Sequence, residues 1–424
     1  MSGPAERMNA RVARMTLLLA VALVIAGCSS SGGTTKSTPP VNSGSASASA
    51  SATSTGSSLA RPSRSGSDGS PGSPALVHQK LTHFRMTDVT FTGSEAWALG
   101  TADCLGGSGT CAAMEHSGDN GRTWQSASIP RSSVNLQGHC TDPCLVHVRF
   151  ATAKVGYLFG ARNFSSDNSE ALFMTTDGGR SWQRQSGGAA ALETLGGNVI
   201  RVIDQGGCPP GCAYRVQTAA VGSSAWRTVT LPGPYPLGDG AQLGRANGVA
   251  YLEAYGNPAG GGQTETAVLW TSTDNGTSWR NRGEPCPRVG GQEYDSDTLS
   301  VAPDGSASVV CRPRLQQGHQ FTVTTTDGGR TFHAGSRTAL GAESVTAFGA
   351  ASSRVLLVGL GDTFRSTDDG RRFARLGANG GSSPGNPHYV GFASSTVGHA
   401  ISSDRRTLWT TRDSGATWTA HKFT

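Results

Sequence analysis

The sequence has little charge. Asp, Glu, Lys and Arg make up only 15% of its 424 residues, lysines are few, and the arginines are scattered along the chain. A nucleic-acid-binding surface needs clustered Lys and Arg, so the sequence gives no case for one. Its apolar stretch at 16–26 is too short to cross a bilayer as a mature helix.

Catalytic signatures are missing as well. We find neither a nucleophile elbow nor a His/Glu zinc motif, and the ten histidines are dispersed. Glu253, Asp295 and Asp297 could supply a catalytic carboxylate pair, but nothing in their spacing singles them out. We therefore expect no cofactor and no catalytic residue.

The N-terminus reads as a targeting segment. A basic region with Arg7, Arg11 and Arg14 precedes the apolar stretch, which ends in Ile-Ala-Gly followed by Cys28. This arrangement resembles a bacterial lipoprotein signal, and the resemblance implies cleavage before Cys28 and lipidation of its thiol. The alternative is an ordinary secretory signal that happens to end in Cys. We predict a signal peptide at 1–27 and attachment to the extracytoplasmic face of the cell membrane.

Residues 28–75 follow as a predicted tether. They are almost wholly Ser, Gly, Thr, Ala and Pro after Cys28, and such a composition cannot bury enough apolar surface to become ordered. A flexible segment of this length has a root-mean-square reach of about 35–40 Å. The formal charge is +6, and Arg7, Arg11, Arg14 and Glu6 account for a net +2 of it, which leaves a mild positive charge on the rest.

One pattern returns six times: Ser or Thr, any residue, Asp, any residue, Gly, two residues, then Trp or Phe. Each copy lies between two apolar runs, which predicts a β-hairpin with the pattern at its turn. Asp accepts backbone N–H groups in turns and Gly permits positive φ, so we interpret the pattern as structural. A Ca²⁺ loop would need more oxygen ligands than it offers. The aspartates are Asp119, Asp177, Asp274, Asp327, Asp368 and Asp413.

The spacing of the pattern predicts its architecture. Successive aspartates are 58, 97, 53, 41 and 45 residues apart, and the long interval is close to twice the others. It predicts a seventh, decayed copy, with Thr218, Gly222 and Trp226 as its remnants and Ala220 where the aspartate should be. Two more apolar runs precede each turn. Four strands per unit predict an all-β, seven-bladed β-propeller of four-stranded antiparallel blades over 76–424.

These repeats resemble the BNR or Asp-box superfamily. The likeness is nearest to seven-bladed propellers of the photosystem II assembly-factor type, with sortilin-type domains and sialidases more distant. It covers roughly residues 80–424 and is specific for fold and weakly specific for activity. The assembly-factor likeness implies a chaperone-like role in assembling membrane complexes.

Eight cysteines remain once Cys28 is set aside. An even number in an exported protein predicts disulfides, and sequence proximity suggests neighbouring pairs. The alternative is a metal site built from Cys140, Cys144, His139 and His147. The suggested pairs are Cys104–Cys111, Cys140–Cys144, Cys208–Cys212 and Cys286–Cys311.

The repeat also predicts two unlike faces. We call each copy of the repeated pattern an Asp-box. If it joins the third and fourth strand of each blade, the turns between the first and second strands lie on the same side of the ring, which we call the box face. The other connections, including all four predicted disulfides, then lie on the opposite side, which we call the long-loop face. These loops are long and varied: 131–146, 161–170, 233–247, 254–266, 283–295, 312–320 and 376–387.

Long loops on a rigid scaffold are where binding residues concentrate. Disulfides there either reduce the entropy cost of ordering the loops for a ligand or simply protect them. We expect exposed aromatic residues, Arg and His on this face to contact a ligand, because aromatics and Arg dominate binding hot spots. The candidates are Arg162, Phe164, Tyr235, Tyr255, Tyr294, Arg312, Arg314, His319 and His388.

Two functions remain open at this point. The favoured one is a membrane-tethered binding or scaffold module for a protein, peptide or glycan, with no nucleic-acid partner. The alternative is a sialidase-like glycoside hydrolase, whose chemistry needs three arginines, a Tyr activated by a Glu, and an acid/base Asp. Tyr251 and Glu253 are close in sequence, but alternation along a strand would make both ordinary propeller residues. Ile129, Pro130 and Arg131 only echo the Arg-Ile-Pro signature of that family, out of order.

Overall fold

A computed structural model describes residues 81–423 except for 105–108, 131–144, 161–170, 204–214, 234–237, 257–265, 315–317, 338 and 379–380. The predicted segments 1–27 and 28–75, including Cys28, lie outside the described residues. Strands make up the regular structure of the described part, where no helix is long and apolar enough to cross a membrane.

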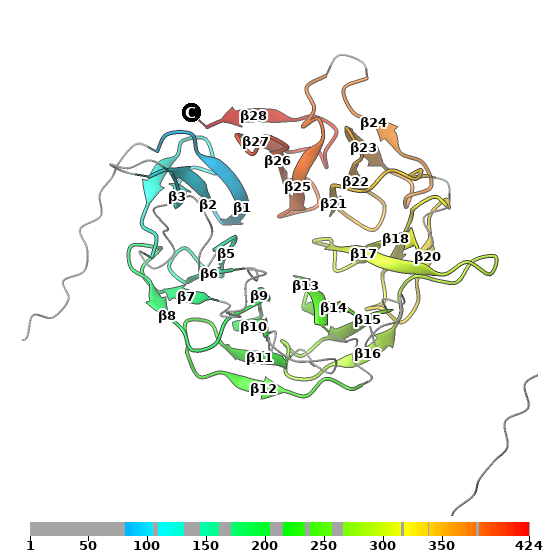
Figure 1. The fold of residues 1–424 in the computed structure, drawn as a ribbon, viewed down its shortest axis with the longest axis horizontal. Coiled ribbons are helices and arrows are strands. Elements are labelled where there is room, and N and C mark those ends of the chain that lie inside the picture. Colours follow the sequence, from blue (N-terminus) through cyan, green and yellow to red (C-terminus); the bar gives the residue numbers. More distant parts are fainter. Residues whose placement is uncertain are drawn as a thin grey trace, which may run out of the picture. The chain divides into compact units, whose positions relative to one another are not determined.

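Seven four-stranded antiparallel sheets are arranged in a ring, which confirms the predicted seven-bladed propeller (Figure 1). Each sheet contains four consecutive strands, numbered here from the innermost outward. The first three blades are β1 (Arg85–Thr92), β2 (Glu95–Asp103), β3 (Thr110–Ser117) and β4 (Gln125–Ala127); β5 (His147–Phe150), β6 (Gly156–Phe159), β7 (Leu172–Thr175) and β8 (Gln183–Arg184); and β9 (Ala191–Leu195), β10 (Asn198–Ile203), β11 (Arg215–Ala220) and β12 (Arg227–Val229).

The remaining four blades repeat this order and complete the ring. They are β13 (Gly238–Ala246), β14 (Val249–Gly256), β15 (Thr266–Ser272) and β16 (Arg280–Gly283); β17 (Tyr294–Val301), β18 (Ala307–Pro313), β19 (Phe321–Thr325) and β20 (His333–Ala334); β21 (Ala347–Ala350), β22 (Leu356–Gly359), β23 (Thr363–Ser366) and β24 (Ala374–Arg375); and β25 (Pro387–Phe392), β26 (Gly398–Ser402), β27 (Thr407–Thr411) and β28 (Thr419–Lys422).

Each of the six Asp-boxes closes the turn between the third and fourth strand through the same hydrogen bonds. In blade 4, the Ser272 hydroxyl donates to Asp274 Oδ1 at 2.8 Å and accepts the Gly276 N–H at 2.9 Å. The same carboxylate oxygen accepts the Ser278 N–H at 2.9 Å. Gly276 has a φ of 81°, which favours glycine. The boxes are thus turn-forming elements in this fold.

The third blade lacks a box, and its register corrects the sequence alignment. Thr218 lies inside β11, paired with Ile200 and Arg227, so it does not begin the turn. Backbone hydrogen bonds close the turn instead, from Val221 N to Gly197 O and from Ser223 N to Ala220 O. Trp226 keeps a packing role, since it contacts the cluster between blades 2 and 3. Blade 3 therefore forms without the motif that marks the other six blades.

Large side chains fill the spaces between blades. The Trp97 and Phe150 rings of blades 1 and 2 stack with centroids 3.5 Å apart. Blade 7 closes on blade 1 by the same means, with the Phe84 and Phe423 rings 5.2 Å apart and Met86 N donating to Arg405 O at 2.7 Å. Because every described sheet consists of consecutive strands, the ring closes without strand exchange between the ends of the propeller.

Two disulfides lie within the described residues, and both match the predicted pairs. Cys104–Cys111 closes the connection between β2 and β3, with Cα atoms 5.0 Å apart. Cys286–Cys311 ties the connection between β16 and β17 to the far end of β18, with Cα atoms 5.6 Å apart. Both bridges are at the ends of strands opposite to the Asp-boxes, as expected for the long-loop face. Cys140, Cys144, Cys208 and Cys212 lie outside the described residues.

Candidate functional site: the axial channel

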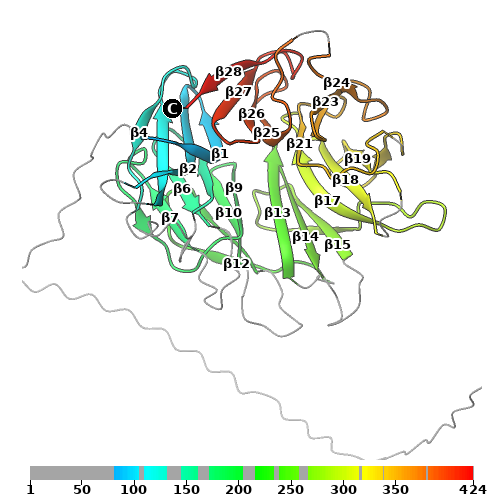
Figure 2. The same cartoon turned by 45° about the horizontal axis from the view of Figure 1, so that its top comes forward.

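The innermost strands of all seven blades surround a cavity of about 670 Å³ at the centre of the ring. Figure 2 shows the ring tilted, with the strands crossing its thickness between the two faces. Each inner strand ends at the short turn to the second strand, so the channel is lined by strand residues and by turn residues of the box face. Among its lining residues are Arg149 of β5, Glu193 of β9, Arg245 of β13 and His388 of β25.

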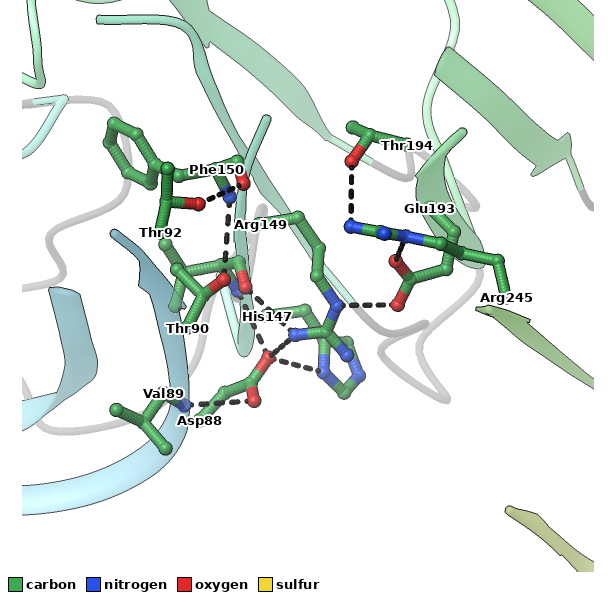
Figure 3. Close-up of polar contacts among 11 residues, drawn as sticks. Asp88, Val89, Thr90, Thr92, His147, Arg149, Phe150, Glu193, Thr194 and Arg245 are labelled. Atoms are coloured by element: carbon green, nitrogen blue, oxygen red, sulfur yellow. Dashed lines mark hydrogen bonds and ion pairs between the residues drawn. The ribbon is translucent and has the colours of Figure 1, made fainter. Parts of the chain in front are cut away.

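One wall of the channel is a chain of ion pairs that joins four blades (Figure 3). Arg149 Nη1 donates to Asp88 Oδ2 of β1 at 2.6 Å, and Arg149 Nε donates to Glu193 Oε1 at 2.8 Å. Glu193 Oε2 lies 3.6 Å from Arg245 Nε. Arg245 Nη2 also donates to the Thr194 hydroxyl at 3.3 Å. These ion pairs thus connect blades 1 to 4 along a wall that contains two guanidinium groups.

Asp88 is the buried end of this chain, with its side chain 3% exposed. Burial opposes ionisation of the carboxyl, but the Arg149 guanidinium, His147 and the Val148 N–H outweigh it and lower the pKa of Asp88. Its other oxygen accepts the Val89 N–H at 2.9 Å. The pKa of Arg149 is raised: burial lowers it, but the Asp88 and Glu193 carboxylates more than compensate. Both groups stay charged at neutral pH.

Apolar and aromatic side chains of blades 1, 6 and 7 also line the channel. They are Phe91, Phe348, Val390 and Phe392, and the Phe91 ring stacks on His399 with centroids 3.6 Å apart. Burial lowers the pKa of His399 to about 3, so this imidazole is neutral and packs like an aromatic ring. The channel is therefore lined by guanidinium groups and by apolar side chains.

The described lining contains a single carboxylate. Glu193 is the one carboxylate among the described lining residues, and it contacts both Arg149 and Arg245. The described lining offers no second carboxylate to form a hydrolytic pair with it.

Glu253 does have a raised pKa, but it lies outside the channel. It is fully buried between β14 and β17, where the Ser296 hydroxyl donates to Oε1 and Oε2 has no hydrogen-bond partner. Burial, helped by the Asp297 charge and opposed by Ser296, raises its pKa to about 7. Tyr251, also buried, donates its hydroxyl to Gly305 O at 2.8 Å. Neither side chain is accessible to a substrate.

The structure distributes the predicted contact residues unevenly. Arg162, Phe164 and Tyr235 lie outside the described residues, as does the side chain of Tyr255. His319 and His388 are exposed, and His388 alone of the nine lines the axial channel. Burial and the nearby Arg405 lower the pKa of His388, although Asp88 opposes this.

The other three lie beside the Cys286–Cys311 bridge. Tyr294 is only 7% exposed and packs edge-on against Phe321. This corrects the expectation of an exposed aromatic: Tyr294 begins an inner strand and turns into the blade. Arg314 donates to Asp295 Oδ1 at 2.7 Å and also pairs with Glu293, while Arg312 lies 3.8 Å from Asp297. These arginines are bound to local carboxylates.

Sequence reasoning missed the channel residues themselves. Asp88, Arg149, Glu193 and Arg245 are 44 to 61 residues apart along the chain where they pair directly, and none belongs to a motif. A local signal was present only for Glu193, which is the one charged residue of its inner strand, β9. The alternative metal site is not tested, because His139, Cys140 and Cys144 lie outside the described residues. Its fourth residue, His147, lies 3.3 Å from Asp88. Within the described residues no group of three His, Cys, Asp or Glu could hold an ion.

No protein-family model matches the sequence, and no curated protein matches it either. Solved structures do match. YCF48 bound to a D1 peptide aligns with 82% of this chain and 95% of its own, at 15% identity and a TM-score of 0.50. A PL25 ulvan lyase aligns with 81% of this chain and 96% of its own, at 8% identity and a TM-score of 0.51. At these identities the likeness concerns the fold alone, so the chain shares its β-propeller fold with a peptide-bound protein and with a polysaccharide lyase.

Proposed function

We propose that this chain is an Asp-box propeller that binds a segment of another protein, and that it does so at the axial channel. The observation that carries the proposal is the channel itself, which is lined by Arg149 and Arg245 and by the aromatic rings of Phe91, Phe348 and Phe392. Such a cavity fits an extended segment carrying a carboxylate and an apolar side chain. YCF48, which has the same fold, is bound to a peptide in its solved structure, which supports this choice.

Arg245 is the guanidinium best placed to meet a ligand, because its side chain is 41% exposed and its contacts at 3.3 and 3.6 Å are long. We expect Arg245→Glu to reduce peptide binding at least about tenfold, since it reverses a charge at the contact. The measurement is selection of a displayed random peptide library on the full chain, followed by titration of the enriched peptides. Wild-type protein should enrich sequences that combine an acidic and an apolar residue.

Arg184→Glu is the matched control, because Arg184 is an exposed arginine on the outer strand β8. It should leave peptide affinity unchanged. If Arg245→Glu binds the enriched peptides as tightly as wild type, the channel is not the binding site. The hydrolase alternative has its own outcome: turnover of fluorogenic glycosides that is lost in Arg245→Glu would replace the binding proposal with an enzymatic one.

We also propose that Cys28 carries a lipid anchor that holds the propeller at the extracytoplasmic face of a bacterial membrane. The support is the basic and apolar segment that ends at this cysteine, and the composition of 29–75. Cells labelled with an alkyne fatty acid should incorporate it into the wild-type chain and not into Cys28→Ser. Equal labelling of the two would exclude a lipid on this thiol.

A further inference from the structure

A second cavity, of about 590 Å³, lies at the outer rim between blades 3 and 4. One side is the outer edge of blade 3, and the other is the Asp-box of blade 4. It shares no residue with the axial channel. Its lining residues are Thr218, Arg227, Thr228, Val229, Thr230, Pro232, Thr277, Ser278 and Trp279.

Thr218 is the unusual member of this crevice. It is 6% exposed, and its hydroxyl has no hydrogen-bond partner. Leaving a buried hydroxyl unpaired costs about 1–3 kcal/mol, so such a group calls for a partner. Arg227 is exposed beside it and makes no hydrogen bond or ion pair with any residue that the structure describes.

The next blade shows what fills the equivalent space. Thr271 of β15 pairs with Arg280 of β16, just as Thr218 of β11 pairs with Arg227 of β12. Two residues further along, blade 4 has Arg282, whose Nε donates to the Thr271 hydroxyl at 2.8 Å. Its Cγ also lies against Gly329 of the next Asp-box. Arg282 lies at a register shift between β15 and β16. In blade 3 the residue two positions after Arg227 is Val229, which pairs with Val216 and has no polar group to donate to the Thr218 hydroxyl.

In blade 4, the group from the protein's own chain that fills the equivalent crevice is therefore a guanidinium. Blade 6 gives a second case, in which Arg365 Nε donates to Ser414 O of the blade 7 Asp-box at 2.9 Å. Neighbouring positive charge does not prevent this. Burial, Arg330 and Arg280 lower the pKa of Arg282, and Asp327 of the facing box only partly opposes them, yet Arg282 Nε still donates to the Thr271 hydroxyl.

We propose that the crevice between blades 3 and 4 binds an arginine side chain of a protein partner. The incoming guanidinium takes the place that Arg282 occupies one blade later. It donates to the Thr218 hydroxyl, and its stem lies along Val229 and Trp279. Asp274 supplies the negative charge from behind Ser278, which donates to its carboxylate. This site lies outside the channel and does not depend on the proposed function.

The test uses Nα-acetylarginine amide and the full chain, with binding followed by saturation-transfer NMR. We expect wild type to bind this probe and to bind the uncharged citrulline analogue at least about tenfold more weakly, because a charge-assisted hydrogen bond is lost. Arg245→Glu, which alters the channel, should leave the arginine probe bound. The two proposals can thus fail independently.

Two substitutions locate the site. Val229→Arg places a guanidinium in the crevice from within the chain, and it should abolish probe binding while maintaining or raising Tm. Thr218→Val removes the unpaired hydroxyl at constant shape, and it should weaken binding about tenfold without loss of Tm. Gln125→Arg, which adds an arginine to the exposed start of β4, is the control for charge and should bind normally.

Several results would overturn the proposal. The first is no binding of the arginine probe to wild type, and the second is equal binding of arginine and citrulline. The third is unchanged binding in Thr218→Val, which is the informative variant should Val229→Arg fail to fold. Equal loss in Gln125→Arg would show that the effect is general repulsion and not occupation of the crevice.

Discussion

Arg149→Met should destabilise the propeller by about 3–5 kcal/mol at pH 7, which is the usual cost of removing one partner from a buried ion pair. The substitution leaves Asp88, whose side chain is 3% exposed, without the guanidinium that now lies 2.6 Å away. It also removes the contact to Glu193 and so separates blades 1, 2 and 3 at the axis. The measurement is the urea dependence of unfolding, followed by Trp fluorescence.

The pH dependence of the stability lost in Arg149→Met provides an internal check. In wild type the lowered pKa of Asp88 contributes stability above its unfolded pKa, near 3.9, and this contribution is lost as the pH falls through the folded pKa. In Arg149→Met the buried Asp88 carboxyl lacks its cation, so burial raises its pKa, and protonation removes the unpaired buried charge. The difference between variant and wild type should therefore shrink from pH 7 to pH 4.

Arg245→Met is the matched control, because this side chain is 41% exposed and its ion pair is long. We expect it to cost less than about 1 kcal/mol. Asp88→Asn combined with Arg149→Met should recover part of the loss, since no unpaired charge then remains buried. A cost below about 1 kcal/mol for Arg149→Met would mean that the ion-pair chain does not hold the blades together.

Glu253→Gln should stabilise the protein by about 3 kcal/mol at pH 8 and have almost no effect at pH 4. Burial raises the pKa of Glu253 to about 7, so the folded state holds its proton more tightly than the unfolded state does. Ionisation of the unfolded chain therefore removes stability as the pH rises from about 4.3 to about 7, and the loss is level above that. Glutamine keeps the shape and the hydrogen bond from Ser296 without the charge.

The comparison with wild type at each pH reports on Glu253 together with its effect on Glu284, whose raised pKa is due to burial and in part to the Glu253 charge. Glu115 is also buried, and its pKa is also raised to about 7, so some pH dependence should remain in the variant. Glu95→Gln is the control, at a partly exposed carboxylate 2.6 Å from His116, and it should bring no gain at pH 8. If Glu253→Gln is no more stable than wild type at pH 8, the Glu253 carboxyl has more access to water than its burial indicates.

The long-range organisation of the chain could be predicted because it is repeated. The Asp-box contains its own turn-forming hydrogen bonds within a few residues, so each copy identifies a hairpin without any tertiary information. Even the blade without a box was predictable, because the interval of 97 residues left room for it. The internal alignment of that blade was not, since the register of β11 depends on its partners Ile200 and Arg227.

The residues of the channel and of the rim crevice could not be predicted in this way. Tyr294 appeared in sequence as a loop aromatic, yet it packs against Phe321 inside its blade. Arg149 carried no local signal, because its partners Asp88 and Glu193 come from the blades on either side. The rim crevice exists because Val229 stands where the next blade has Arg282, and this difference acquires meaning only when the two blades are superimposed in register.

The sequence by itself determined the number of blades, the hairpin turns and the pairing of the cysteines within the described residues, since each depends on residues close together in the chain or on a regular period. Tertiary structure alone decided which charges meet at the axis and which hydroxyl at the rim is buried without a partner among the described residues. The physical reason is that a propeller builds its cavities between blades. The chemistry of each cavity is set by pairs of residues that only closure of the ring brings together.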